Sequence, residues 1–271
     1  MSDKPLAFIT GAARGIGRAT AIEFARRGHD IALLDVLDKP LRETEDLIRQ
    51  AGAATSRHVV DLQDLSAAEA AVRRTAREFG RIDVLVNNAA WRELLTMRQI
   101  TLQSWEKSLR ISLTAPAFLS KWAAETMQSR GRGVIINVSS IYSRRGAGIS
   151  PSYVAAKGGL DALTYELAAL YGRHGIRVVA VNPGAVDTEM SGDYAGKSGE
   201  SLTDRLVQHS NDLNPIGRVA RPEEIARFIC MLASEDASYV NGATIRVDGG
   251  LGSGSMMPNS LKKMLHPDEF K

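Results

Sequence analysis

The sequence has one cysteine in 271 residues, Cys230, so it cannot form an internal disulfide. Cys230 lies in the apolar run RFICMLA, where we expect a core side chain. The five histidines show no spacing typical of metal ligands, and no metal site is predicted. A reducing, cytoplasmic setting fits these features best.

Long apolar runs are also absent. None reaches the ~20 residues that a membrane-spanning helix needs, and the first ten residues, MSDKPLAFIT, lack the pattern of a secretory signal. The 34 basic and 31 acidic residues nearly balance, and the basic runs are only pairs. We therefore expect neither a nucleic-acid nor a membrane partner.

Short apolar runs rich in Val and Ile alternate with longer amphipathic segments, a pattern typical of a parallel sheet covered on both faces. The predicted fold is α/β: a Rossmann-type, doubly wound parallel sheet of about seven strands, forming one domain over residues 1–271. The expected strands are 6–10, 31–35, 56–60, 82–87, 133–139, 176–182 and 243–247, and the expected helices include 16–27, 66–79, 153–171 and 221–234.

Two segments interrupt this alternation. Residues 187–220 are polar and rich in Gly and Ser, and the tail 252–271 follows the last expected strand. Excursions of this length in a compact domain are usually functional lids or disordered segments. We interpret 187–220 as a substrate lid.

Glycines dominate the junction between the first expected strand and helix. Gly11, Gly15 and Gly17 allow a tight turn and close approach of a pyrophosphate to a helix N-terminus. Asp35 ends the second strand, where a carboxylate accepts hydrogen bonds from adenosine ribose hydroxyls. Together these features predict dinucleotide binding, although Asp35 alone is also consistent with a surface residue.

Tyr153 and Lys157 are four residues apart and would share one face of a helix. A phenol with its ordinary pKa of about 10 is a poor acid or base near neutrality, and a fixed cation lowers that pKa. The pair is therefore a candidate tuned acid/base. A core Tyr beside a surface Lys is an equally simple reading of these two residues alone.

Taken together and in order, these motifs resemble the short-chain dehydrogenase/reductase family from about residue 5 to 251. TGAARGIG resembles the family's cofactor turn, and YVAAK its Tyr-x-x-x-Lys motif. NNAA, at 87–90, resembles its Asn-Asn-Ala-Gly motif with Ala90 in place of Gly. Ser140 precedes Tyr153 by the family's thirteen residues, and NPGAVDTEM resembles its Pro-Gly turn.

The resemblance implies roles for these residues. Tyr153 would be the general acid in carbonyl reduction and the base in alcohol oxidation. Lys157 would lower its pKa and hold the nicotinamide ribose, and Ser140 would hydrogen-bond the substrate oxygen. The implied cofactor-binding set is Gly11, Arg14, Gly15, Ile16, Gly17, Asp35, Asp61, Leu62, Asn88, Ala89, Ala90, Tyr153, Lys157, Pro183, Gly184, Val186 and Thr188, although packing alone explains Leu62 and Val186 equally well.

Ser112 departs from the family pattern. Seven residues after Trp105, it stands where the family usually has an Asn that opens a helix carbonyl to a water and links the Lys to solvent. A Ser hydroxyl can also disturb helix hydrogen bonding, so the relay would survive in altered or slower form. Alternatively, the backbone carbonyl alone supports the water relay, and Ser112 is merely tolerated at this position.

The expected cofactor is NAD(H) rather than NADP(H). The Asp35 carboxylate would repel a 2′-phosphate. Arg14 instead favours NADP(H), because the family often has a basic residue at this position that binds the 2′-phosphate. Asp35 is expected to prevail because its repulsion is directed, while Arg14 is long enough to reach solvent. Val36 supplies no second cation.

Substrate residues are expected in loops beyond the strand ends. The candidate substrate residues, listed at the end of this paragraph, are polar and include arginines, which favours a sugar, polyol or hydroxy acid as substrate. By the same resemblance, the chain is expected to form a homotetramer. The first alternative is a 3-oxoacyl-carrier-protein reductase, which GRVARPEEIA and YVNGATIRVDGG resemble; another is a non-catalytic cofactor-binding sensor or structural subunit. The candidate substrate residues are Trp91, Arg92, Tyr142, Arg145 and Ser150, although Arg145 is also consistent with a solvated side chain.

Overall fold

The computed structural model describes residues 3–146, 148–192, 203–253, 257–265 and 268–269. Its seven strands form one parallel sheet in the order β3-β2-β1-β4-β5-β6-β7, which confirms the predicted fold. The strands are β1 (Leu6–Thr10), β2 (Asp30–Asp35), β3 (Thr55–Val59), β4 (Val84–Asn87), β5 (Gly133–Val138), β6 (Ile176–Pro183) and β7 (Thr244–Val247).

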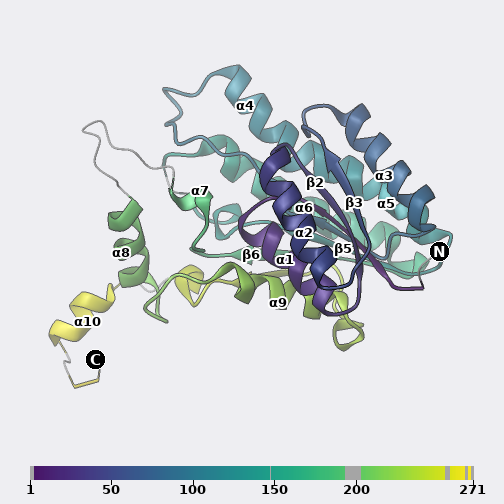
Figure 1. The fold of residues 1–271 in the computed structure, drawn as a ribbon. Coiled ribbons are helices and arrows are strands. Elements are labelled where there is room, and N and C mark those ends of the chain that lie inside the picture. Colours follow the sequence, from purple (N-terminus) through teal and green to yellow (C-terminus); the bar gives the residue numbers. More distant parts are fainter. Residues whose placement is uncertain (1–2, 147, 193–202, 254–256, 266–267, 270–271) are drawn as a thin grey trace.

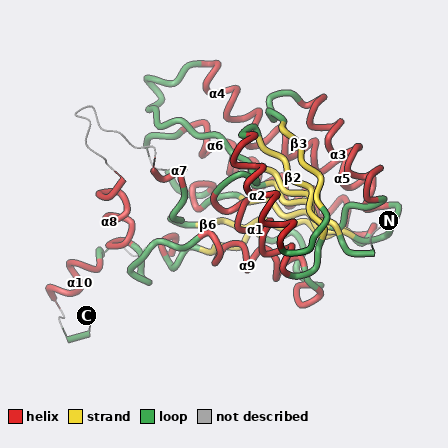
Figure 2. The backbone as a smooth tube through the Cα atoms, in the orientation of Figure 1, coloured by secondary structure: helices red, strands yellow, loops and turns green. Residues whose placement is uncertain are grey.

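Helices cover both faces of the sheet (Figures 1 and 2). The central strands are mostly apolar because successive side chains point to opposite faces and both faces are buried. In β1, Ala7 and Ile9 join one core, while Leu6 and Phe8 join the other. The first core is closed by α1 (Gly15–Arg26), α2 (Asp38–Gln50) and α9 (Pro222–Ala233), and the second by α3 (Leu65–Phe79), α5 (Ala115–Gln128) and α6 (Pro151–Tyr171).

The strand order reverses between β1 and β4, which pair with each other. The chain runs outward from β1 to β2 on one side and from β4 to β5 on the other. Crossover connections therefore leave this point on opposite faces and open a crevice at the carboxyl ends of the strands. The glycine turn after β1 and the Asn-Asn-Ala-Ala segment after β4 both lie there.

The expected lid and tail are only partly described. Residues 193–202 of the lid and 254–256, 266–267 and 270–271 of the tail lie outside the described residues. The described parts form α7 (Glu189–Gly192), α8 (Thr203–Leu213) and α10 (Asn259–Leu265). In Figure 1, α8 and α10 lie beside each other, away from the sheet.

The described residues contain neither a membrane-spanning helix nor a cluster of metal ligands. No helix there is long and apolar enough to cross a membrane. Within the same ranges, no three His, Cys, Asp or Glu side chains are grouped so that they could hold a metal ion.

Candidate active site

The glycine turn after β1 has a backbone that only glycine adopts easily. Gly11 and Gly15 have φ angles of +65° and +52°, in the left-handed region that disfavours side chains. Gly17 is constrained by space instead, because a Cβ there would lie 2.0 Å from the Gly11 carbonyl oxygen. The turn consequently brings the start of α1 close to the crevice, where unpaired helix N–H groups attract anions.

Asn88 fastens the turn to the end of β4. Its side-chain amide donates to the carbonyl oxygens of Thr10 and Gly11 at 3.0 and 3.1 Å. The Thr10 hydroxyl in return accepts from the backbone N–H groups of Asn88 and Ala89 at 3.0 and 3.1 Å. The NNAA motif therefore shapes the glycine turn as well as contributing to the wall of the crevice.

Asp35 also holds this turn. Its carboxylate accepts from the backbone N–H groups of Ala13 and Leu37, each at 3.0 Å. These bonds fix the carboxylate at the end of β2, beside the glycine turn. That placement suits a group that accepts hydrogen bonds from a ribose.

A cavity of about 460 Å³ joins the glycine turn to the Tyr-Lys pair. A glycine-rich turn, a helix N-terminus and buried polar groups around one cavity fit a nicotinamide dinucleotide. Most of the expected cofactor residues line it: Gly11, Arg14, Gly15, Ile16, Asn88, Ala89, Ala90, Tyr153, Lys157, Pro183, Gly184, Val186 and Thr188.

Four expected cofactor residues do not line this cavity. Gly17 and Asp35 instead shape the glycine turn that forms part of the cavity wall, as described above. Asp61 is exposed and accepts from the backbone N–H of Gln63 at 2.9 Å. Leu62 is 5% exposed and packs in the core on the α3 side, in line with the packing explanation.

Helix α6 buries the Tyr-Lys pair in the cavity wall. Tyr153 and Lys157 are 7% and 2% exposed. The Lys157 ammonium donates to the Val138 carbonyl at 2.6 Å, and its Nζ lies 5.5 Å from the centre of the Tyr153 ring. Burial lowers the pKa of Lys157 to about 8, and the negative charge of Asp161 partly opposes that shift.

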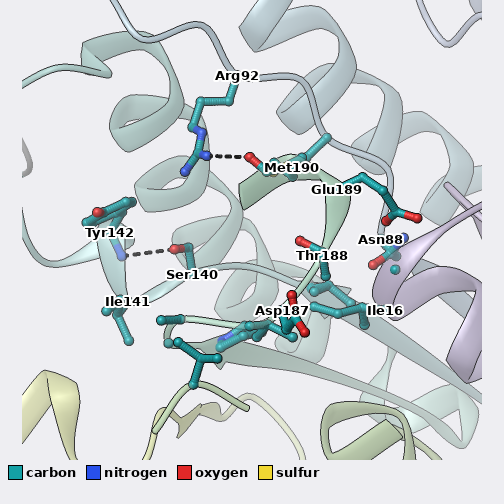
Figure 3. Close-up of a pocket in the computed structure, with 18 of the residues that line it drawn as sticks. Ile16, Asn88, Arg92, Ser140, Ile141, Tyr142, Asp187, Thr188, Glu189 and Met190 are labelled. Atoms are coloured by element: carbon teal, nitrogen blue, oxygen red, sulfur yellow. Dashed lines mark hydrogen bonds between the residues drawn. The ribbon is translucent and has the colours of Figure 1, made fainter. Parts of the chain in front are cut away.

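Ser140 lies on the same wall, at the end of β5. Its hydroxyl accepts from the backbone N–H of Tyr142 at 3.1 Å, which opens a short 3₁₀ turn, Ile141–Ser143 (Figure 3). The Tyr142 ring meets the Tyr153 ring edge-on, with centroids 6.4 Å apart. The structure thus brings Ser140, Tyr153 and Lys157 to one cavity, as the resemblance implies.

A buried polar pair behind this wall was missed at the sequence level. The Asn182 side-chain amide lies 3.1 and 2.9 Å from the two carboxylate oxygens of Asp161 and donates to the Ser140 carbonyl at 3.0 Å. Asp161 and Asn182 are 5% and 2% exposed. Asp161 follows Lys157 by one helical turn, a spacing that was visible in the sequence. Its partner on β6 was not.

Ser112 lies at a distortion of the helix that carries it. Between α4 (Leu102–Leu109) and α5, residues Arg110–Thr114 form a π-helical turn, in which the Ala115 N–H bonds to the Arg110 carbonyl. Such widened turns recur at functional sites. The fully buried Ser112 hydroxyl accepts from the backbone N–H of Trp91 at 3.1 Å. The helix is therefore opened with Ser, not Asn, at this position.

The expected substrate residues separate into two groups. Arg92 and Tyr142 line the cavity. Trp91 instead lies under the Lys107 ammonium, 4.5 Å from its ring centre. Arg145 donates to the Leu251 carbonyl at 3.0 Å, and the buried Ser150 hydroxyl is 3.4 Å from the Glu93 carbonyl oxygen. None of these last three is among the described residues that line the cavity.

Residues 11–252 match the family model described as Enoyl-(Acyl carrier protein) reductase. Cis-4-hydroxycyclohexanecarboxylate dehydrogenase of Sinomonas cyclohexanicum is 39% identical over 90% of this chain and 95% of its own. Galactitol 2-dehydrogenase of Agrobacterium fabrum is 35% identical over 90% and 96%. The structure of carveol dehydrogenase from Mycobacterium avium in complex with NAD superposes with a TM-score of 0.85, at 28% identity over 91% of this chain and 97% of that one.

These similarities extend over nearly the whole length of each protein, not over the dinucleotide crevice alone. The relatives are dehydrogenases, and the sheet order and the order of the motifs agree with the resemblance stated from the sequence. The chain belongs to the short-chain dehydrogenase/reductase family of oxidoreductases.

Proposed function

We propose that this protein is an NAD(H)-dependent oxidoreductase that interconverts a secondary alcohol and a ketone in one dinucleotide-binding and catalytic domain. One observation carries the proposal: buried Tyr153 and Lys157, with Ser140, share the cavity that contains the glycine turn. A purely structural role would not need a buried ammonium beside a phenol, because burying a charge is costly.

Three side chains would carry the protein's part of the reaction. Tyr153 would give a proton to the carbonyl oxygen during reduction and take one from the alcohol during oxidation. Lys157, held by the Val138 carbonyl, would stabilise the phenolate and bind the nicotinamide ribose. Ser140 would hold the substrate oxygen with its hydroxyl. The nicotinamide supplies or accepts the hydride when bound.

The preference for NAD(H) rests on Asp35. Its carboxylate is fixed at the end of β2 by two backbone N–H groups, so it cannot easily move away from a 2′-phosphate. Arg14 lines the cavity and is the competing cation. The NAD complex of carveol dehydrogenase supports this choice by analogy.

The substrate class would be a polyol, sugar or hydroxy acid. The relatives that act on a hydroxycyclohexanecarboxylate and on galactitol support it. The test is to assay a panel of sugars, polyols, cyclic alcohols and hydroxy acids with NAD⁺ and NADP⁺. Turnover with at least one secondary alcohol, and at least a ~100-fold loss in Tyr153→Phe with unchanged NADH binding, would support the proposal. Full activity in Tyr153→Phe would refute the mechanism.

A homotetramer is proposed as the assembly. Three large side chains on α5 and α6 are well exposed in the isolated chain: Phe118 is 40%, Tyr165 45% and Leu170 56% exposed. In the proposed tetramer these side chains pack against another copy of the chain. Light scattering at micromolar concentration should return four times the mass of the chain, and a monomer would contradict the proposal.

A further inference from the structure

The two ends of the cavity differ in chemistry. In Figure 3, Ile16 at the start of α1 marks the glycine-turn end on the right, and Ser140 and Tyr142 lie at the other end on the left. The Glu189 side chain belongs to the first end, because one of its carboxylate oxygens comes within 3.8 Å of the place where a Cβ on Gly15 would be. The end that holds Ser140 is therefore left to the substrate, and we call it the substrate end.

Aromatic and aliphatic side chains supply most of the wall beyond the cofactor-binding segments. The Tyr142 ring meets the Tyr153 ring edge-on, with centroids 6.4 Å apart. Leu251 lies against the loop that follows Ser140, since its carbonyl accepts from Arg145 at 3.0 Å. The apolar and aromatic residues that line this part of the cavity are Ile141, Tyr142, Met190, Leu206, Val207, Val219 and Leu251.

Two of these side chains are uncovered. Met190 on α7 and Leu206 on α8 are 41% and 38% exposed, and both line the cavity. Leu206 and Ser210 are one helical turn apart and share the face of α8 that lines the cavity. Removing exposed apolar surface from water is favourable, so a ligand with an apolar skeleton gains free energy by covering these side chains.

Polar side chains at the substrate end already serve the protein itself. The Ser139 hydroxyl lies 3.2 Å from the Lys157 carbonyl oxygen, and Arg92 donates to the Met190 carbonyl at 3.0 Å. A sugar or polyol carries a hydroxyl on nearly every carbon atom, and each hydroxyl that is buried without a partner costs free energy. The wall is therefore better matched to carbon and hydrogen than to a row of hydroxyls.

We infer that Tyr142, Met190 and Leu206 form an apolar subsite that determines substrate specificity. The preferred substrates are secondary alcohols, hydroxy acids among them, whose skeleton beside the reacting carbon is a compact hydrocarbon such as an alicyclic ring. Sugars and polyols are poor substrates. The skeleton is compact because the nicotinamide shares the same cavity of about 460 Å³. The inference rests on the proposed function and narrows its substrate class.

The experiment compares trans-4-methylcyclohexanol with trans-cyclohexane-1,4-diol, which have the same ring and differ by a methyl or a hydroxyl group opposite the reacting carbon. Each is measured with NAD⁺ as a competitive inhibitor of the panel substrate that has the highest kcat/KM, so neither compound needs to be turned over. The inhibition constant of the methyl compound should be lower by about tenfold or more.

Variants of the wall test which side chains provide this preference. Leu206→Ser should raise the inhibition constant of the methyl compound about fivefold or more and change that of the diol less than about twofold. Tyr142→Ser should act in the same direction, whereas Tyr142→Phe keeps the ring and should keep the preference. Gln208→Ser is the matched control, because Gln208 is an exposed residue of the same helix that does not line the cavity.

Equal inhibition by the two compounds, or stronger inhibition by the diol, would overturn the inference. Equal weakening of both compounds by Leu206→Ser would mean that α8 only supports the cavity, and the inference would again be wrong. Weaker binding of the diol alone in Tyr142→Phe would show that the Tyr142 hydroxyl recognises polar substrates. A sugar or polyol as the best substrate of the panel also refutes the inference and leaves the proposed function intact. No turnover of any alcohol in the panel defeats the proposed function itself.

Discussion

The amide of Asn182 on β6 reaches both carboxylate oxygens of Asp161 on α6, at 3.1 and 2.9 Å. The same amide donates to the Ser140 carbonyl, so this buried pair connects the segment that carries the serine to the helix that carries Tyr153 and Lys157. The Asp161 charge also lies close enough to raise the pKa of Lys157 against the opposing effect of burial. The pair therefore links the geometry of the site to its electrostatics.

Asp161→Asn should change the pH dependence of the reaction. Without the carboxylate, the pKa of Lys157 should fall further below its value of about 8, because burial would act with less opposition. If the ammonium supports Tyr153, the alkaline fall in kcat/KM should begin at lower pH than in the parent. Exposed Glu43→Gln removes the same charge far from the site and should leave the profile unchanged. A parental profile in Asp161→Asn would exclude this role.

Ser112 gives a prediction about both stability and rate. Ser112→Ala leaves the half-buried Trp91 N–H without its side-chain acceptor and should cost about 1–3 kcal/mol in the free energy of unfolding. Ser112→Asn retains an acceptor and restores the residue usual in the family. If Ser weakens the water relay, this variant should have a higher kcat with unchanged NADH affinity. A folded but inactive Ser112→Asn would show that the helix is built around serine. Thermal unfolding and steady-state kinetics measure the two effects.

Cofactor choice should follow the charge at the end of β2. An Asp35 carboxylate about 4 Å from a phosphate charge would be worth about 4 kcal/mol at an effective dielectric near 20, before screening. The parent should therefore favour NAD(H) by about tenfold or more in kcat/KM. Asp35→Ala should reduce that preference, and adding Val36→Arg should reverse it, since Val36 is 58% exposed and has room for the longer side chain. Equal kinetics with NADP(H) in the parent would show that Arg14 outweighs Asp35.

His58 should make the fold sensitive to acid. Burial, and to a smaller extent Arg74, lower the pKa of His58 to about 4, below its ordinary 6.5. The unfolded chain therefore binds the proton more tightly, so this stabilisation is complete above about pH 6.5 and is lost as the pH falls towards 4. Chemical denaturation across that range should show a shallower pH dependence for His58→Gln. Exposed His174→Gln should retain the parental dependence, and an unchanged slope in His58→Gln would rule out the explanation.

The sequence predicted those parts of the fold that depend on local chemistry. Seven apolar runs became seven strands; the five inner ones are buried on both faces, whereas β3 and β7 at the edges of the sheet are only partly buried. Gly11 and Gly15 marked a turn that needs positive φ angles. Helix α8 was hidden in a segment that appeared only polar. Its apolar residues Leu206 and Val207 line the cavity, a position that a periodic pattern does not identify.

Prediction of the site from the sequence was limited for the same physical reason. Tyr153 and Lys157 could be paired because they share a helix, where spacing determines proximity. Asp161 and Asn182 could not, since they lie on different elements that only the completed sheet brings together. Arg92 and Arg145 were equivalent candidates in the sequence, and only the folded loops show that Arg92 lines the cavity whereas Arg145 donates to the Leu251 carbonyl.

The attachment of α10 to α8 has a practical consequence for handling the protein. Ser260 on α10 bonds to Asp212 at 2.8 Å, and the Asn259 amide bonds to the Asn214 carbonyl at 2.7 Å. Because α8 also lines the cavity through Leu206, shortening the chain before residue 259 would remove a support of the cavity wall. Purification tags are better placed at the N-terminal end of the chain, which Figure 1 marks far from α10.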